Sequence, residues 1–178
     1  MEKESFEQIM AWHAGPFLAG FKPASLVSFQ KSMFHDIDEV LAEYEPCFNC
    51  KGISTYKLSQ GHRAVMMLFY RRNQLQEDLR QPEARALLQQ LGYPDTEVVE
   101  ELLAFLRGRI EAAQGFPHEI GLFLGYPVVD VQGFIENRGQ NFCFSGYWKV
   151  YANEAETRRL FDKYTNCIHL FCSRLAQR

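Results

Sequence analysis

The residues best suited to chemistry lie in one segment rich in glycine and proline, Gly115-Phe-Pro-His-Glu-Ile-Gly-Leu-Phe-Leu-Gly-Tyr-Pro127. His118 is its candidate general acid or base, because an unperturbed imidazole titrates near neutral pH. The neighbouring Glu119 is a second candidate catalytic residue. In an extended segment the two side chains would face opposite sides, so Glu119 is expected to orient another group. A tight structural turn holding a hydrogen-bonded histidine is the alternative interpretation.

The end of this segment is a candidate ligand-binding site. Residues 119–124 are expected to form a strand, and Gly125-Tyr126-Pro127 to lead from it into a helix. Ligands of α/β sheets gather where strands end and helices begin, and the free N–H groups of a helix N-terminus can receive an anion. Gly125 and Tyr126 are therefore predicted to contact substrate.

Two lysines are candidate groups for holding a polar or anionic substrate. Lys22 stands between Gly20 and Pro23, just ahead of an expected strand. Lys149 lies on the face of another expected strand that is opposite to Trp148. A solvated side chain is the alternative for Lys22, and a plain solvent-facing strand is the alternative for Lys149.

His13 and Ala14 complete the predicted site. They adjoin Gly15-Pro16, an irregular segment of the kind that approaches ligands closely and carries function in many proteins. We expect His13 and Ala14 to meet Lys22 and His118 in one cleft.

The cysteines have the spacing of half a zinc site in Cys47-Phe-Asn-Cys50. The other half would have to come from Cys143, or from the C-terminal group of Cys167, His169 and Cys172. On a helix, however, Cys167 would point roughly 160° away from His169. Five cysteines without a signal peptide also favour free thiols over a disulfide framework. We therefore expect reduced thiols and no metal-ligating residues.

Several enzyme classes lack their motifs here. The zinc-protease motif that begins with His118-Glu119 needs a second histidine where this chain has Leu122. The chain contains no G-x-G-x-x-G, no G-x-x-x-x-G-K-[ST] and no G-x-S-x-G sequence. These absences argue against a nucleotide-fold dehydrogenase, a P-loop enzyme and a nucleophile-elbow hydrolase.

Composition restricts the partners. The net charge is −3 over 178 residues, and Arg71-Arg72 is too small a basic cluster to hold a polyanion, so no nucleic-acid partner is expected. No apolar run reaches the roughly 20 residues of a membrane span, so no membrane partner is expected. The N-terminus lacks a signal-peptide pattern, which predicts a cytoplasmic protein.

The apolar periodicity predicts an α/β fold in a single domain over residues 1–178, with an α+β arrangement as the alternative. We expect a mixed sheet of about five strands with helices packed on it. Predicted strands cover residues 24–29, 53–58, 63–70, 119–124 and 142–151. Predicted helices cover residues 3–13, 36 or 38 to 46, 82–92, about 95–110, 127–135 and 160–175.

Two of the strands carry more detailed predictions. The stretch 64–70 is apolar on both faces, which is typical of a central strand. In the strand over residues 142–151, period-two alternation places four apolar residues on one face: Phe142, Phe144, Trp148 and Val150. Trp148 is therefore predicted to be a core residue rather than a ligand-binding one.

Five segments of the sequence resemble the bacterial domain-of-unknown-function family 3793. These are Phe116 to Pro127, Asp130-Val-Gln-Gly-Phe-Ile135, Gly146-Tyr-Trp-Lys-Val-Tyr151, His13-Ala-Gly-Pro16 and Gly20-Phe-Lys-Pro-Ala-Ser-Leu26. The resemblance covers nearly the whole chain. It implies a bacterial, cytoplasmic setting and brings no established activity.

The chain departs from the family pattern at one position. The pattern has a cysteine directly after the first histidine, where this sequence has Ala14. If that cysteine is a nucleophile in relatives, this chain is inactive, divergent or engineered at that position.

Two functional hypotheses follow. The first is an enzyme acting on a small polar or anionic molecule, with His118 as acid or base and residue 14 as the nucleophile position. The second is a non-catalytic protein that binds a metal, haem or a redox partner through its histidines, thiols and aromatic residues. The sequence defines neither a cofactor nor an oligomeric state.

Overall fold

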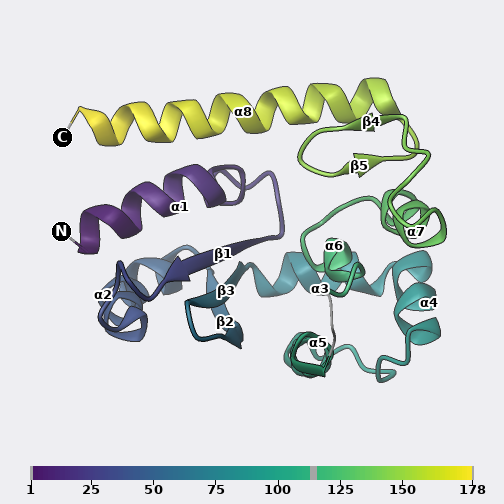
Figure 1. Ribbon diagram of the computed structural model, residues 1–178, viewed down its shortest axis with the longest axis horizontal. Helices are drawn as coiled ribbons and strands as arrows, with labels where there is room; N and C mark the ends of the chain where they lie inside the picture. The colour runs from purple at the N-terminus through teal and green to yellow at the C-terminus, as the bar shows by residue number, and fades with distance from the viewer. Residues whose placement is uncertain (1, 113–115, 178) are drawn as a thin grey trace.

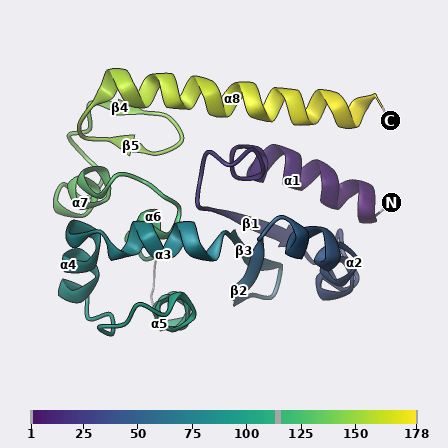
Figure 2. The same ribbon diagram turned by 180° about the vertical axis from the view of Figure 1, so that it is seen from behind.

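The structure is a computed structural model that describes residues 2–112 and 116–177. Gly115 of the glycine- and proline-rich segment lies outside these residues. A small sheet lies in the middle of the N-terminal half, with helices on both of its faces (Figure 1). Helix α8 (Glu154–Ala176) runs along one side of the whole molecule, over both halves (Figures 1 and 2).

The main sheet has three antiparallel strands in the order β1-β3-β2. They are β1 (Ala24–Gln30), β2 (Ser54–Gln60) and β3 (Ala64–Tyr70). The two strands predicted over residues 53–58 and 63–70 are confirmed as β2 and β3, which pair as a hairpin, and the central position of β3 is confirmed as well. Tyr70 pairs with Ala24 on one side and with Ser54 on the other.

The two faces of β3 are buried in different apolar clusters. Met67 and Phe69 pack in a cluster with residues of α1 (Glu2–Leu18) and α2 (Ile37–Cys50). Leu68 belongs to a second cluster, which includes residues of α5 (Val99–Ala112). Because one strand contributes to both clusters, we propose that the chain folds as one unit.

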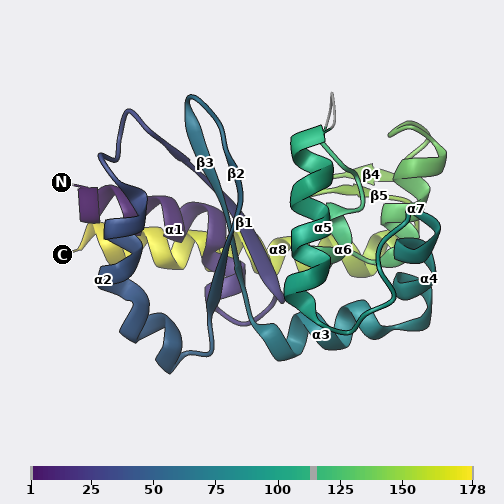
Figure 3. The same cartoon turned by 90° about the horizontal axis from the view of Figure 1, so that it is seen from below.

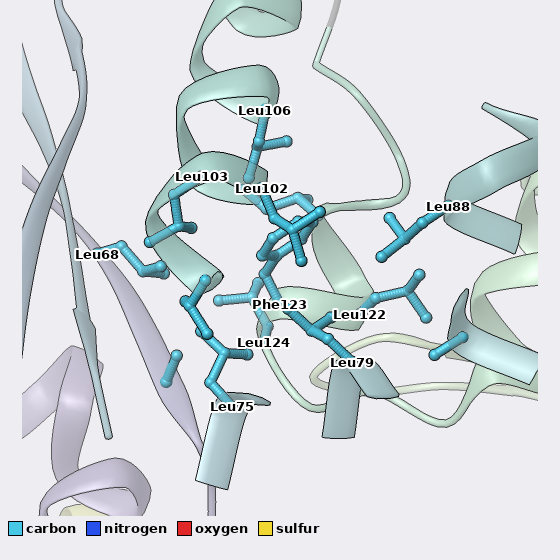
Figure 4. Packing of buried hydrophobic residues seen from close by; sticks show 14 of the residues in the cluster. Leu68, Leu75, Leu79, Leu88, Leu102, Leu103, Leu106, Leu122, Phe123 and Leu124 are labelled. Carbon is cyan, nitrogen blue, oxygen red and sulfur yellow. The ribbon is translucent and has the colours of Figure 1, made fainter. Parts of the chain in front are cut away.

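The second cluster continues through four further helices, α3 (Arg72–Arg80), α4 (Pro82–Gln90), α6 (Ile120–Phe123) and α7 (Val128–Glu136). Figure 4 shows leucines from α3, α4 and α5 meeting around the α6 residues Leu122 and Phe123. Seen from below, these helices lie together at one end of the molecule, and the sheet and α2 lie at the other end (Figure 3). This cluster supports α6 and the residues that flank it.

The prediction of one sheet with about five strands is wrong. Residues 120–123 form the single-turn helix α6, in which the Leu124 N–H donates to the Ile120 carbonyl at 3.1 Å. Residues 142–151 are a separate hairpin of β4 (Phe144–Ser145) and β5 (Lys149–Val150). The fold is therefore mixed, with helices predominating and two small sheets.

The turn of this hairpin explains why one continuous strand does not form. The Gly146 N–H donates to the Trp148 carbonyl at 3.0 Å and reverses the chain. A side chain at residue 146 would clash with the ring of Phe161. Trp148 and Val150 are buried as predicted, but Trp148 also lines a cavity, so a core position does not separate it from a binding site. Phe142 is exposed and lies outside their cluster.

Two helices extend beyond their predicted ends. Helix α1 continues through Pro16 to Leu18, and α2 continues through Pro46 to Cys50. Proline disfavours a helix interior, but in α1 the burial of residues 14–17 outweighs this local preference, and in the last turn of α2 Phe48 is the buried residue. In α1, an added Cβ on Gly15 would lie 3.4 Å from the Ile168 Cα, so the helix end packs closely on α8. Helix α3 was not predicted, and only Leu75 and Leu79 on it are buried.

Other helix boundaries agree with the sequence. Asp36 caps α2 by accepting from the Asp38 N–H at 2.8 Å, and Pro82 begins α4. Within the described ranges, none of the helices combines the length and apolar character needed to cross a membrane.

Candidate functional site

A cavity of about 340 Å³ lies between the α6–α7 region and the β4–β5 hairpin. Three residues singled out in the sequence line it, namely His118, Tyr126 and Lys149. We call it the aromatic pocket, because most of its larger lining side chains are rings. The full lining is Phe116, Pro117, His118, Ile120, Gly121, Tyr126, Asp130, Val131, Phe134, Ser145, Gly146, Tyr147, Trp148 and Lys149.

Two pairs of rings shape the pocket. Tyr126 stacks on Trp148 with their ring centroids 4.4 Å apart. The exposed His118 ring lies 4.7 Å from the ring of Phe134, on α7. Such ring pairs contribute roughly 0.5–1.5 kcal/mol of stabilisation in addition to the contribution of the surface area that they bury. The predicted acid or base thus lies at an accessible edge of an otherwise apolar wall.

Two glycines allow the segment around α6 to fold against its neighbours. A Cβ on Gly121 would lie 2.8 Å from Val131 Cγ2, so a glycine lets α6 pack closely on α7. Gly125 has a φ of +76°, in the left-handed region, and any side chain there would clash with Pro23. Gly125 does not line the pocket, so its position is explained by the turn and by this close approach.

Asp130 is the main residue of the site that sequence reasoning missed. It is 2% exposed, and its Oδ2 accepts from Trp148 Nε1 at 2.8 Å. Its Oδ1 accepts from the backbone N–H groups of Tyr151 at 2.7 Å and Ala152 at 3.3 Å. Asp130 therefore ties α7 to the hairpin. An acidic residue within the apolar run Val128-Val-Asp-Val131 was the available signal.

Lys149 supplies a cation beside the pocket. Its Nζ donates to the Gly139 carbonyl at 2.6 Å and lies 4.8 Å from the centroid of the Phe142 ring. Across residues 2–112 and 116–177, no carboxylate forms an ion pair with it. The ammonium keeps donors for a further acceptor, because lysine has three.

Glu119 does not line the aromatic pocket. It is 2% exposed and accepts hydrogen bonds from the Tyr93 hydroxyl at 3.1 Å and from Arg109 Nε at 2.5 Å. Burial, followed by the nearby Glu119 charge, raises the pKa of Tyr93. His118 and Glu119 contact different partners, although both line a second cavity of about 480 Å³. The orienting role of Glu119 stays a prediction.

Lys22 lies behind the pocket wall rather than in its lining. Its Nζ is 5.6 Å from the centroid of the Tyr126 ring and 5.9 Å from that of Tyr164 on α8. Burial lowers the pKa of Lys22 to about 8 and raises the pKa values of both tyrosines. Tyr126 thus separates Lys22 from the cavity that His118 lines.

His13 and Ala14 are not among the lining residues of the aromatic pocket. His13 is exposed, and its carbonyl accepts from Ser25 Oγ at 2.9 Å. Ala14 is 0% exposed and packs in the cluster that α1 shares with the sheet. The structure therefore groups His118, Tyr126 and Lys149, places Lys22 behind them, and puts residue 14 in the core.

The cysteines are free thiols in the structure, with Cys47, Cys50 and Cys143 exposed. In the part of the chain that the structure describes, no three His, Cys, Asp or Glu side chains are placed to hold a metal ion together. Their reduced state in solution stays a prediction.

The fold and the pocket define a small protein of helices and two short sheets, with an aromatic pocket between α6, α7 and the β4–β5 hairpin. Residues 10–178 match the sequence profile of the family described as "Protein of unknown function (DUF3793)", and the chain belongs to this family. The match confirms the resemblance seen in the sequence. Comparison with curated proteins and with solved structures gives no match.

Proposed function

We propose that the chain binds a small polar or anionic molecule in the aromatic pocket and that His118 exchanges a proton with it. One observation carries the proposal. His118 and Tyr126 were selected from one segment of the sequence and Lys149 from another, and all three line one cavity of about 340 Å³. A concave, mostly apolar site with a few polar groups is the usual form of a small-molecule site.

The roles of the three residues follow from their surroundings. The exposed imidazole of His118 is accessible to both solvent and ligand, as an acid or base must be. The Lys149 ammonium offers a charge to a polar substituent, and the Tyr126 ring forms part of the apolar wall. The buried Ala14 has no part in this mechanism, so the proposed chemistry needs no nucleophile at residue 14.

A non-catalytic binding protein using the same pocket is the second candidate. It is favoured by Asp130, whose two oxygens already accept three hydrogen bonds and so have a structural use. In this reading His118 contacts the ligand without transferring a proton. We further propose a cytoplasmic bacterial setting and a small molecule, rather than a nucleic acid, as the partner.

Fluorescence of Trp148 offers a direct test. The chain has two tryptophans, so Trp12→Phe leaves Trp148, in the pocket wall, as the sole reporter. This variant is screened against a library of small metabolites by fluorescence. Each compound that changes the signal is then followed by NMR for conversion or for proton exchange with solvent.

The acid or base role is tested with His118→Asn, and His62→Asn is the control at an exposed histidine on the β2–β3 turn. We expect conversion or exchange to be lost in His118→Asn and kept in His62→Asn, with binding changed by only a few fold. Binding with no His118-dependent conversion supports the non-catalytic candidate instead. If no compound changes the Trp148 signal, the proposal fails.

A further inference from the structure

Rings from three separate segments surround the aromatic pocket. They come from the turn before α6, from α6 to α7, and from the β4–β5 hairpin: Phe116, His118, Tyr126, Phe134, Tyr147 and Trp148. Aromatic groups pack best on other rings, in offset or edge-to-face contacts with centroids about 4.5–7 Å apart. A flat ring is therefore the shape that contacts several of these walls at once.

The charges of the pocket favour an anion. Asp130 is the acidic residue among its lining residues, and its carboxylate is engaged by Trp148 Nε1 at 2.8 Å and the Tyr151 N–H at 2.7 Å. Lys149, by contrast, donates to a neutral carbonyl and, among the described residues, has no carboxylate in an ion pair. An anionic group on the ligand would compensate this charge.

We propose that the ligand of the aromatic pocket is a flat aromatic or heteroaromatic acid. Its ring lies among the rings around Trp148 and Phe134, and its acid group accepts a hydrogen bond from Lys149. This inference rests on the proposed function and specifies the class of molecule. A volume of about 340 Å³ suits a compound of one or two rings.

Four probes separate the contributions of ring and charge. Benzoate has both, benzamide keeps the ring without the charge, and cyclohexanecarboxylate keeps the charge without the aromatic ring. Benzylamine carries the opposite charge. Dissociation constants are measured from the Trp148 fluorescence of the Trp12→Phe variant of the 178-residue chain.

We expect benzoate to bind about tenfold more tightly than each of the other three probes. A tenfold change in affinity is what the loss of one charge-assisted hydrogen bond or one ring contact should cause. Lys149→Gln should remove the difference between benzoate and benzamide, and Lys163→Gln, an exposed lysine on α8, should keep it. The comparison of probes on the unsubstituted site is decisive even if Lys149→Gln does not fold.

Two results would overturn the inference. One is equal affinity for benzoate and benzamide, and the other is equal or tighter binding of benzylamine or cyclohexanecarboxylate. In either case the pocket still binds small molecules and the proposed function stands. If none of the four probes changes the signal but a metabolite of another class does, the proposed ligand class is wrong and the proposed binding function of the pocket stands. If no compound does, both proposals fail.

Discussion

The ammonium of Lys22 lies 5.6 Å from the centroid of the Tyr126 ring, and Tyr126 in turn stacks on Trp148. The loop between α1 and β1 is thereby joined to the wall of the aromatic pocket. This contact connects two residues that the sequence suggested for one site. It places Lys22 behind the wall, where it contacts Tyr126, whereas His118 and Lys149 line the pocket itself.

Stability should rise with pH between about pH 8 and pH 10. Burial lowers the folded-state pKa of Lys22 from 10.5 to about 8, so over this interval the unfolded chain holds a proton that the folded chain has lost. Above pH 10 the raised pKa values of Tyr126 and Tyr164 act in the opposite direction, because the unfolded chain then loses protons first. Urea unfolding at each pH measures this profile.

Lys22→Met should flatten this slope and raise the free energy of unfolding at pH 7. The lowered pKa of Lys22 corresponds to a cost of roughly 3 kcal/mol for its charge in the folded protein. Partial exposure and the two ring contacts reduce the expected gain in the free energy of unfolding to about 1–2 kcal/mol. Lys31→Met, at an exposed position, should leave the slope unchanged. An unaltered slope in Lys22→Met would contradict this account.

Trp148→Ala should lower the free energy of unfolding by about 3–5 kcal/mol. The indole is 8% exposed, packs edge-on against Phe161 at 4.5 Å and donates to Asp130. Trp148→Phe keeps most of the packing but leaves Asp130 Oδ2 without its donor, so we expect a smaller loss, of about 2 kcal/mol. Chemical denaturation measures both, and unchanged stability in Trp148→Ala would rule out a core role.

Glu119→Ala should lower the free energy of unfolding by about 2–3 kcal/mol, because the Tyr93 hydroxyl and Arg109 lose their shared acceptor. Glu156→Ala, at an exposed position on α8, is the matched control and should change it by less than about 0.5 kcal/mol. Glu119→Gln should bind pocket ligands within about twofold of the wild type if Glu119 acts only by positioning the turn. A large loss of affinity in a folded Glu119→Gln protein would indicate direct contact with the ligand.

Ala14→Cys should give an unreactive thiol. Ala14 is 0% exposed in the cluster between α1 and the sheet, so a reagent reaches residue 14 only when the protein opens. Titration with a thiol reagent across pH should show the same slow reaction with and without His118→Ala. Exposed Cys50 provides the internal standard for a fast reaction. A rapid, His118-dependent reaction would restore residue 14 to the site.

The sequence by itself determined the elements whose signals are local. The apolar stretch of β3, the helix beginning at Asp36 or Asp38 and the helix beginning at Pro82 each depend on neighbouring residues and were predicted from them. Tyr126, Lys149 and His118 were also selected from residue type and local context. Their selection needed no knowledge of the rest of the chain.

The tertiary structure decided the features that depend on partners distant in the sequence. The short apolar run after Glu119 satisfies either a helix or a strand, and it forms α6 because the apolar residues of α3, α4 and α5 surround it without offering a strand edge. Helix α1 continues through Pro16, although proline disfavours a helix interior, because its last turn is buried against α8. Asp130 acquires its role only when the hairpin brings Trp148 to it. The same contacts between α7 and the hairpin create the aromatic pocket, which no local pattern contains.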